Sequence, residues 1–131
     1  MDKKNKKNKK NKKDLGRWGE DLAASIVSRM GYEILMRNVT FRGGELDIVA
    51  LDGDELVILE VRVRTKGKVQ SPTESVGPIK VKRLLRAGSL LVERLEWDGP
   101  WRLDVMGITL GGDVAKGYEC EYIKDITLGM I

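Results

Sequence analysis

The sequence predicts an α/β (α+β) domain in which helices flank one mixed central sheet. Two segments carry apolar residues at helical spacing, and five segments carry the short alternating or continuous apolar runs typical of strands. Their order along the chain is α-β-β-β-α-β-β. With 131 residues, the chain has room for one domain with a single core, which we place at residues 14–131.

The first helix is expected to begin at Asp14, which can cap it, and to end near Met30. Gly31 follows at the position where a left-handed residue commonly terminates a helix. The apolar stripe of this helix has period 3.6 and consists of Leu15, Trp18, Leu22, Ile26 and Met30. Residues 1–13 repeat Lys-Lys-Asn and hold no apolar side chain after Met1, so we expect a disordered tail there.

Three strands should follow the first helix. Their expected ranges are 32–38, 45–51 and 55–65. Asp52-Gly53 separates the last two and predicts a hairpin with a two-residue loop, because both residues tolerate the positive φ that such turns need. This loop would pair Leu51 with Asp54.

The second half of the chain predicts one helix and two strands. Residues 71–74 read Ser-Pro-Thr-Glu, a capping-box pattern with proline at the first helical position. Pro78 can restart the helix, and an amphipathic stripe runs over residues 79–95. The last strands are expected over residues 101–110 and 118–126, on either side of a Gly-Gly-Asp loop.

Composition excludes several kinds of active site. The chain has no His and one Cys, Cys120, so Ser-His-Asp or Cys-His catalysis and His- or Cys-bound zinc sites are excluded. Any chemistry must use carboxylates, Lys, Arg, hydroxyls or a metal held by oxygen. The eight Lys of residues 1–13 hold a net charge of +7 there, and the rest of the chain is mildly acidic. No apolar run reaches the length of a membrane span, so we expect a cytoplasmic protein without a membrane partner.

The strongest candidate for chemistry is one face of the predicted hairpin. Side-chain alternation places five charged residues on it: Glu45, Asp47, Glu60, Arg62 and Arg64. Acids on adjacent strands lie about 5 to 8 Å apart, and like charges at that spacing destabilise a sheet. A divalent cation between Asp47 and Glu60 would offset this repulsion. Cross-strand salt bridges to Arg62 and Arg64 would offset it as well, and the sequence leaves both solutions open.

Further basic residues surround this acidic centre. They are Lys66, Lys68, Lys80, Lys82 and Arg83. A metal-dependent phosphodiesterase needs this arrangement, because cations bind the phosphate backbone while acids hold the metal. The sequence therefore favours nucleic acid as the partner.

A series of short motifs extends this interpretation. In chain order the series is Gly16-Arg17-Trp18-Gly19-Glu20, Gly31-Tyr32-Glu33-Ile34-Leu35, Arg37-Asn38, Gly44-Glu45-Leu46-Asp47-Ile48-Val49-Ala50, Glu60-Val61-Arg62-Val63-Arg64, Lys80 and Leu103-Asp104-Val105. Over residues 14–126 it resembles the YraN family of small bacterial proteins. The resemblance implies a restriction-endonuclease-like fold, similar to archaeal Holliday-junction resolvases, and hydrolysis of phosphodiester bonds in structured DNA rather than RNA.

The resemblance also assigns residues to a PD-(D/E)XK-type site. It implies catalytic roles for Glu20, Asp47, Glu60 and Arg62, supporting roles for Glu45 and Arg64, and Mg²⁺ or Mn²⁺ held by Asp47, Glu60 and Glu20. Arg62 stands where the family pattern has Lys; it keeps the positive charge but cannot act as a base. A catalytically inactive nucleic-acid-binding or adaptor module is the alternative. Related resolvases act as dimers, but no apolar stripe in this sequence marks an interface, so a homodimer and a monomer both stay open.

Overall fold

The computed structural model describes residues 2–42, 44–65, 75–111 and 117–127, with the backbone alone for residues 2–13. Its elements are α1 (Asp2–Arg29), β1 (Glu33–Phe41), β2 (Gly44–Asp52), β3 (Glu55–Thr65), α2 (Pro78–Arg94), β4 (Trp101–Leu110) and β5 (Tyr118–Ile123). The predicted order of helices and strands is confirmed.

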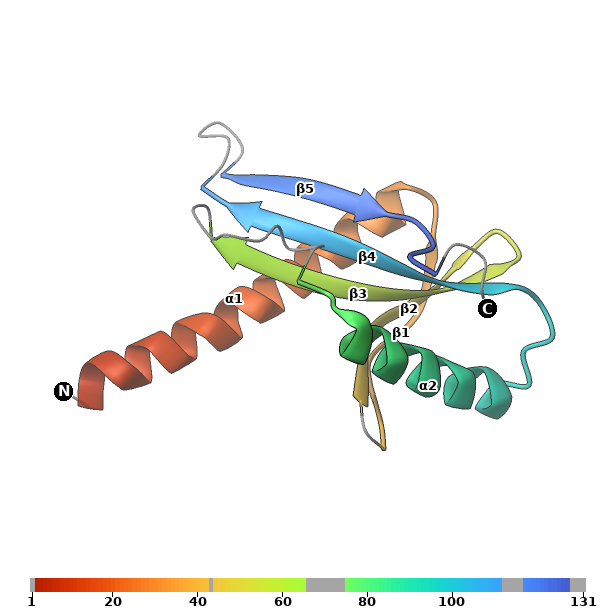
Figure 1. The fold of residues 1–131 in the computed structure, drawn as a ribbon. Coiled ribbons are helices and arrows are strands. Elements are labelled where there is room, and N and C mark those ends of the chain that lie inside the picture. The colour runs from red at the N-terminus through yellow and green to blue at the C-terminus, as the bar shows by residue number, and fades with distance from the viewer. Residues whose placement is uncertain (1, 43, 66–74, 112–116, 128–131) are drawn as a thin grey trace.

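The five strands form one sheet in the order β1-β2-β3-β4-β5 (Figure 1). Neighbouring strands are antiparallel, except that β3 and β4 are parallel. Parallel neighbours need a crossover connection, and α2 lies within it. The expected mixed sheet is therefore confirmed.

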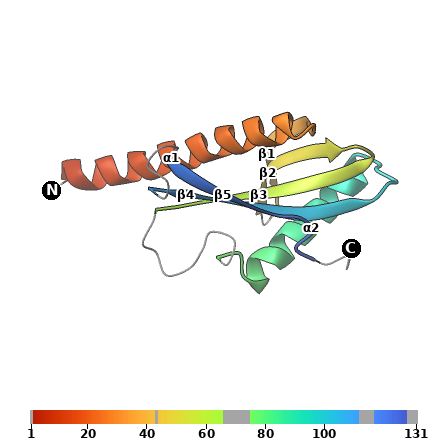
Figure 2. The same ribbon diagram turned by 90° about the horizontal axis from the view of Figure 1, so that it is seen from above.

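The helices cover opposite faces of the sheet, as Figure 2 shows. Ala23 and Val27 of α1 pack in one core cluster with Val57 and Leu59 of β3. On the other face, α2 packs through Leu84, Ala87 and Leu91 against Leu56 and Ile58 of the same strand. Since alternate residues of β3 enter the two cores, this strand is the centre of a three-layer domain.

Helix α1 rests on the sheet through small residues and through Leu22 and Ile26 of the predicted apolar stripe. The stripe is therefore confirmed at its centre and wrong at Trp18 and Met30. Trp18 and Met30 of that stripe are 40% and 49% exposed, whereas Ala23 and Val27 are fully buried. Gly19 lies so close to β3 that an added Cβ would be 2.2 Å from Val63 Cγ2. Because the backbones approach this closely, only small side chains fit at the centre of the contact.

Helix α1 also starts earlier than predicted. It begins at Asp2 and includes residues 2–13, ahead of the predicted start at Asp14. Lys is a good helix former, no Gly or Pro interrupts this segment, and adding turns to an existing helix avoids the cost of nucleation. Neither helix in the described part of the chain is long and apolar enough to cross a membrane.

The hairpin between β2 and β3 differs from the prediction by two residues. Asp52 pairs with Glu55 and Leu51 with Leu56, so the loop is Gly53-Asp54. Gly53 has φ +62°, as expected when glycine is the first central residue of a tight turn. A shift of two residues preserves side-chain parity, so the predicted faces of β3 survive the correction.

The remaining differences concern element ends. β5 stops at Ile123, earlier than expected, because the chain turns near Asp125, whose φ is +51°. The capping-box pattern at residues 71–74 lies outside the described residues, and so does most of the Gly-Gly-Asp loop, at residues 112 and 113. The described α2 begins at Pro78, which confirms proline at the start of this helix.

Candidate functional site

Strands β2 and β3 separate halfway along the sheet and open a cleft. Their pairing runs from Asp52↔Glu55 to Ile48↔Leu59, after which β2 continues beside β1 and β3 continues beside β4. Asp47 and Glu60 are the next residues after the last pair. The cleft has a volume of about 580 Å³ and is lined by Leu15, Gly16, Glu20, Asp47, Glu60, Val61, Arg62, Val63, Arg64, Thr65 and Lys80.

The strands separate at an irregular step of the β1–β2 hairpin. Leu46 packs in the core cluster on the α2 side, whereas Ile48 packs in the cluster on the α1 side, so the alternation of β2 breaks at Asp47. Between Arg37 and Val39, the partners of Ile48 and Leu46, lies Asn38 with φ +54°. This left-handed conformation is uncommon outside glycine, although Asn adopts it more readily than most residues. The irregular step turns Asp47 toward the cleft.

Asp47 is held in place by the backbone of β3. Its Oδ2 accepts a hydrogen bond of 2.9 Å from the Val61 amide. This contact supplies an acceptor for an N–H group at the edge of β3 where pairing with β2 has ended. The carboxylate is therefore fixed across the opening of the cleft.

Three acids from two elements meet at this point. Glu20 of α1 and Glu45 and Asp47 of β2 each offer a carboxylate oxygen, and these oxygens lie within 4.8 Å of one another. In the amide orientation that satisfies both acids, Asn38 donates to Glu20 Oε2 at 3.0 Å and to Glu45 Oε1 at 3.1 Å. Burial, together with the charges of Asp47 and Glu45, raises the pKa of Glu20.

Glu60 is the most buried acid of the cleft, with only 4% of its surface exposed. Burial raises its pKa to about 8, and a hydrogen bond and charge repulsion from Asp47 act in the same direction. Two cations oppose this shift: Arg62 Nε lies 3.3 Å and Lys80 Nζ 3.5 Å from the same oxygen, Glu60 Oε2. The acid is thus surrounded by competing charges rather than neutralised by one close partner.

The cleft brings most of the predicted site residues together. Glu20, Asp47, Glu60, Arg62, Arg64 and Lys80 line it. Glu45 lies beside it, in a second pocket that also includes Glu20 and Asn38. Lys82 and Arg83 are exposed on α2 but do not line the cleft. Lys66 and Lys68 lie outside the described residues.

The salt bridges that the sequence left open are found in part: Arg62 pairs with Glu60 of its own strand, and the described residues show no cross-strand pair of Arg62 or Arg64. Among the described residues, Glu60 is the acid of the cleft that forms ion pairs, and neither Glu45 nor Asp47 pairs with a cation. Arg64 lines the cleft without forming an ion pair to any described acid. Arg37 and Asn38 offset part of the charge on Glu20, but its pKa is still raised, so repulsion among Glu20, Glu45 and Asp47 remains.

This donor set suits a hard divalent cation. The cleft offers carboxylate oxygens, which Mg²⁺ and Mn²⁺ prefer, and nitrogen or sulfur ligands from His or Cys are absent from its lining. The raised pKa of Glu60 and of Glu20 marks a place where added positive charge would lower the electrostatic energy. The residues present thus fit Mg²⁺ or Mn²⁺.

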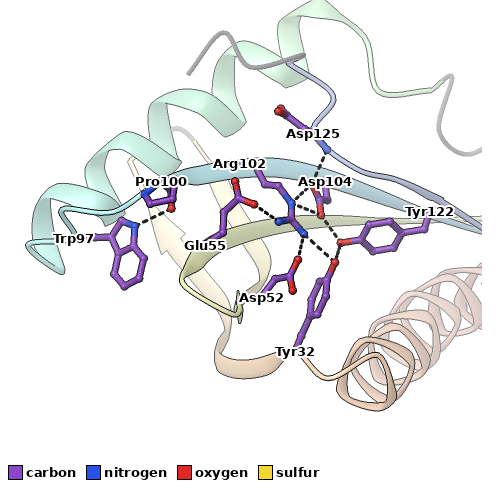
Figure 3. Close-up of polar contacts among 9 residues, drawn as sticks. All are labelled: Tyr32, Asp52, Glu55, Trp97, Pro100, Arg102, Asp104, Tyr122 and Asp125. Carbon is purple, nitrogen blue, oxygen red and sulfur yellow. Dashed lines mark hydrogen bonds and ion pairs between the residues drawn. The ribbon is translucent and has the colours of Figure 1, made fainter.

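A second group of charged residues, which sequence analysis did not identify, lies elsewhere in the sheet (Figure 3). We call Arg102, Asp52, Glu55, Asp104, Tyr32 and Tyr122 the Arg102 network. The Arg102 guanidinium is 2% exposed and contacts Asp52, Glu55, Asp104 and Tyr32. Glu55 and Glu60 are five residues apart on β3, so the network lies about 17 Å from the cleft along this strand.

Asp104 belongs to this network and not to the cleft, although it forms part of the motif series. It is fully buried and accepts hydrogen bonds from Arg102, from the Tyr122 hydroxyl and from the Asp125 amide. Burial and this neighbouring carboxylate raise the pKa of Tyr122. The sequence did contain a signal for the buried network, because Arg102 and Asp104 alternate within a mostly apolar strand. No comparable signal in the sequence predicted the contacts of Asn38 with Glu20 and Glu45.

Comparison with known proteins places the chain in a family. The profile of the uncharacterised protein family UPF0102 matches residues 19–108. A UPF0102 protein of Marinobacter nauticus is 40% identical over 112 residues, which are 85% of this chain and 89% of the relative. One from Streptomyces griseus is 42% identical over 96 residues, 72% and 81% of the two chains. One from Chlorobaculum parvum is 40% identical over 116 residues, 84% and 88% of the two chains. The chain therefore belongs to UPF0102, the family that includes YraN.

Proposed function

We propose that this UPF0102 protein is a metal-dependent endonuclease that hydrolyses phosphodiester bonds of structured DNA in the cleft between β2 and β3. The observation that carries the proposal is the convergence of Glu20, Glu45, Asp47 and Glu60 from α1, β2 and β3, where Glu60 is the acid whose ion pairs the described residues show. Such a surplus of negative charge destabilises the fold unless the site binds something positive.

Asp47 and Glu60 would hold Mg²⁺ or Mn²⁺, assisted by Glu20 and Glu45. The metal would polarise a phosphate oxygen and make a water molecule more acidic. The protein itself contributes fixed ligands: the Val61 amide holds Asp47, and Asn38 holds Glu20 and Glu45. Pre-positioned ligands of this kind reduce the cost of assembling the site.

Positive charge at the cleft would bind the phosphate. Arg62, in the motif position that the resemblance gives to lysine, can stabilise negative charge on the phosphate, but it stays protonated and cannot accept a proton from water. Lys80 and Arg64 also line the cleft. We therefore assign activation of water to the metal site and stabilisation of the phosphate charge to the positive charge that lines the cleft, to which Lys80 and Arg64 contribute.

The Lys-rich part of α1 would extend the binding surface. The helix that contributes Leu15, Gly16 and Glu20 to the cleft continues back through residues 2–13, which hold eight Lys. If all of them contact phosphates, the slope of log affinity against log salt is on the order of −7 for duplex DNA. Deleting residues 2–13 should reduce this slope and leave the rest of the domain folded; an unchanged slope contradicts a role for this segment in DNA binding.

A cleavage assay tests the enzymatic proposal. Wild type, Arg62→Lys and Asp47→Asn are incubated with branched and duplex DNA in Mg²⁺ or Mn²⁺. Wild type is expected to cut, Arg62→Lys to cut at least as well, and Asp47→Asn to cut far more slowly, because it loses a metal ligand. If neither wild type nor Arg62→Lys cleaves DNA under conditions where both bind it, the endonuclease proposal is wrong.

A catalytically inactive nucleic-acid-binding or adaptor module is the second candidate. The ion pairs of Arg62 and Lys80 with Glu60 favour it, because they partly neutralise the most buried acid without a metal. This candidate predicts that calorimetric titration with Mn²⁺ gives the same weak signal for wild type and Asp47→Asn. Tight binding that is lost in Asp47→Asn excludes it.

A further inference from the structure

Two cations of different origin meet at Glu60, and their surroundings differ. Arg62 lies two residues further along the same strand, whereas Lys80 comes from the first turn of α2 on the far side of a crossover. Both approach the same carboxylate oxygen, at 3.3 Å and 3.5 Å. One cation is enough to neutralise the single negative charge of Glu60. The other cation can therefore have a second role.

Arg62 is committed to the protein. Its Nε is buried, makes no hydrogen bond of good geometry and faces Glu60 Oε2. The contact uses one nitrogen of the guanidinium rather than the two-pronged geometry that makes Arg–carboxylate pairs strong. Since Arg62 lies on the same strand as Glu60 and faces it through a buried nitrogen, Arg62 is suited to holding Glu60 in place.

Lys80 is available to a ligand. Its side chain is 33% exposed, it lines the cleft with Asp47 and Glu60, and its contact with Glu60 is the longer of the two. Lys80 is the third residue of α2, and the first turn of a helix is where the macrodipole disfavours a cation. This location is costly for a purely structural lysine, while an ammonium with three donors can bind a phosphate oxygen.

The position of Lys80 is fixed by packing on the opposite face of the sheet from α1. Leu84, Ala87 and Leu91 anchor α2 in its core cluster, and Pro78 begins the helix. The cleft thus receives acids from α1 and β2 and a cation from α2, with Glu60 of β3 between them.

We propose that Lys80 binds the phosphate group of the nucleic acid at the cleft, whereas Arg62 positions Glu60. This assignment rests on the proposed function. In the family pattern one lysine occupies the motif position of Arg62; here Lys80 and Arg62 would share its work. Lys80 contacts the substrate, and Arg62 acts through the metal-holding acid.

The test compares Lys80→Met with Lys124→Met, which removes an exposed lysine outside the cleft. In the presence of Ca²⁺, Lys80→Met should bind a labelled DNA duplex about tenfold more weakly than wild type, as expected for the loss of a hydrogen bond from a charged group. Lys124→Met should bind like wild type. In Mg²⁺, Lys80→Met should lower kcat by about 100-fold. Circular dichroism confirms that each variant is folded.

Two further measurements separate phosphate binding from an indirect effect on Glu60. Mn²⁺ should bind Lys80→Met at least as tightly as wild type, because a cation beside the metal site has been removed. The double variant Arg62→Lys/Lys80→Met should bind DNA as weakly as Lys80→Met, because the side chain at position 62 acts on Glu60 and not on the phosphate.

Equal DNA binding by Lys80→Met and Lys124→Met overturns the proposal, and so does a joint loss of Mn²⁺ and DNA affinity in Lys80→Met. Absence of cleavage by wild type would instead count against the proposed function. The DNA-binding comparison is still decisive for Lys80 in that case, because it does not depend on turnover.

Discussion

The cleft and the Arg102 network each bring several acids together, but the acids of the two regions have different partners. In the Arg102 network, Asp52, Glu55 and Asp104 each accept a bond from the central guanidinium. In the cleft, Glu20, Glu45 and Asp47 face one another; among the described residues, Glu60 forms ion pairs, and the charge of Arg37 acts on Glu20 without forming one. The network is satisfied internally, whereas the cleft is left with charge that a ligand can satisfy. This contrast supports the proposal that the cleft binds a ligand, whereas the contacts of the Arg102 network stabilise the fold.

The largest expected effect comes from removing the centre of the network. Arg102→Met leaves the fully buried Asp104 without its cation, so unfolding in urea should show a loss of about 3–5 kcal/mol. Arg86→Met, on the exposed surface of α2, should change stability by less than about 0.5 kcal/mol. If Arg102→Met does not fold, Tyr122→Phe removes one donor to Asp104 and should cost about 1–2 kcal/mol. Wild-type stability in both network variants would show that the network does not stabilise the fold.

In the cleft, removing a charge should stabilise the protein instead of destabilising it, and Glu60→Gln tests this. The pKa of Glu60 is about 8 in the folded protein and near 4.5 when unfolded, so the folded state binds more protons between these values. Wild-type stability should therefore fall as pH rises through this interval. Glu60→Gln cannot ionise and should gain on the order of 4–5 kcal/mol over wild type by pH 9.

The measurement is chemical unfolding in chelator at pH 5 and pH 9. The exposed Glu93→Gln serves as control and should follow the wild-type pH dependence. Parallel pH profiles for wild type and Glu60→Gln would show that Glu60 is ionised at little cost.

Metal binding to the cleft should stabilise the protein, because the ion compensates the acids there, as the guanidinium compensates the acids of the Arg102 network. At an Mn²⁺ concentration 100 times its Kd, wild type should gain about 2.7 kcal/mol, because the ion binds only the folded cleft. Asp47→Asn keeps an acceptor for the Val61 amide but loses the charge, and it should gain little. Asp54→Asn, in the exposed turn, should respond like wild type. Thermal unfolding measures all three, and an equal shift in Asp47→Asn would place the ion elsewhere.

The smallest expected effect concerns the close approach that brings α1 to the cleft. In Gly19→Ala the new methyl would overlap Val63, so α1 must move and the cost should be about 1–3 kcal/mol. Gly16→Ala lies on the same helix with nothing within 4 Å and should stabilise the protein by up to about 1 kcal/mol. Urea unfolding compares the two, and a gain in Gly19→Ala would contradict the tight packing of α1 on β3.

Local signals accounted for most of the sheet. Alternation along β3 predicted both its buried faces and its charged end, and this held although the hairpin register differed by two residues. Parity survives such a shift, so Asp47 and Glu60 were correctly expected to lie together. The prediction that Trp18 and Met30 of α1 face the core was wrong for a different reason. Which stripe of a helix is buried depends on how closely the helix approaches the sheet, and Gly19 sets that distance.

The sequence by itself determined the order of elements, the mixed sheet and the acids that share one end of the β2–β3 hairpin, because side-chain periodicity is a local property of the backbone. Only the tertiary structure decided which charges meet. Asn38 in a left-handed conformation turns Asp47 into the cleft, α2 brings Lys80 to Glu60 from across a crossover, and Arg102 collects three acids from separate strands. Such contacts depend on distances between elements, which no spacing along one strand or helix encodes.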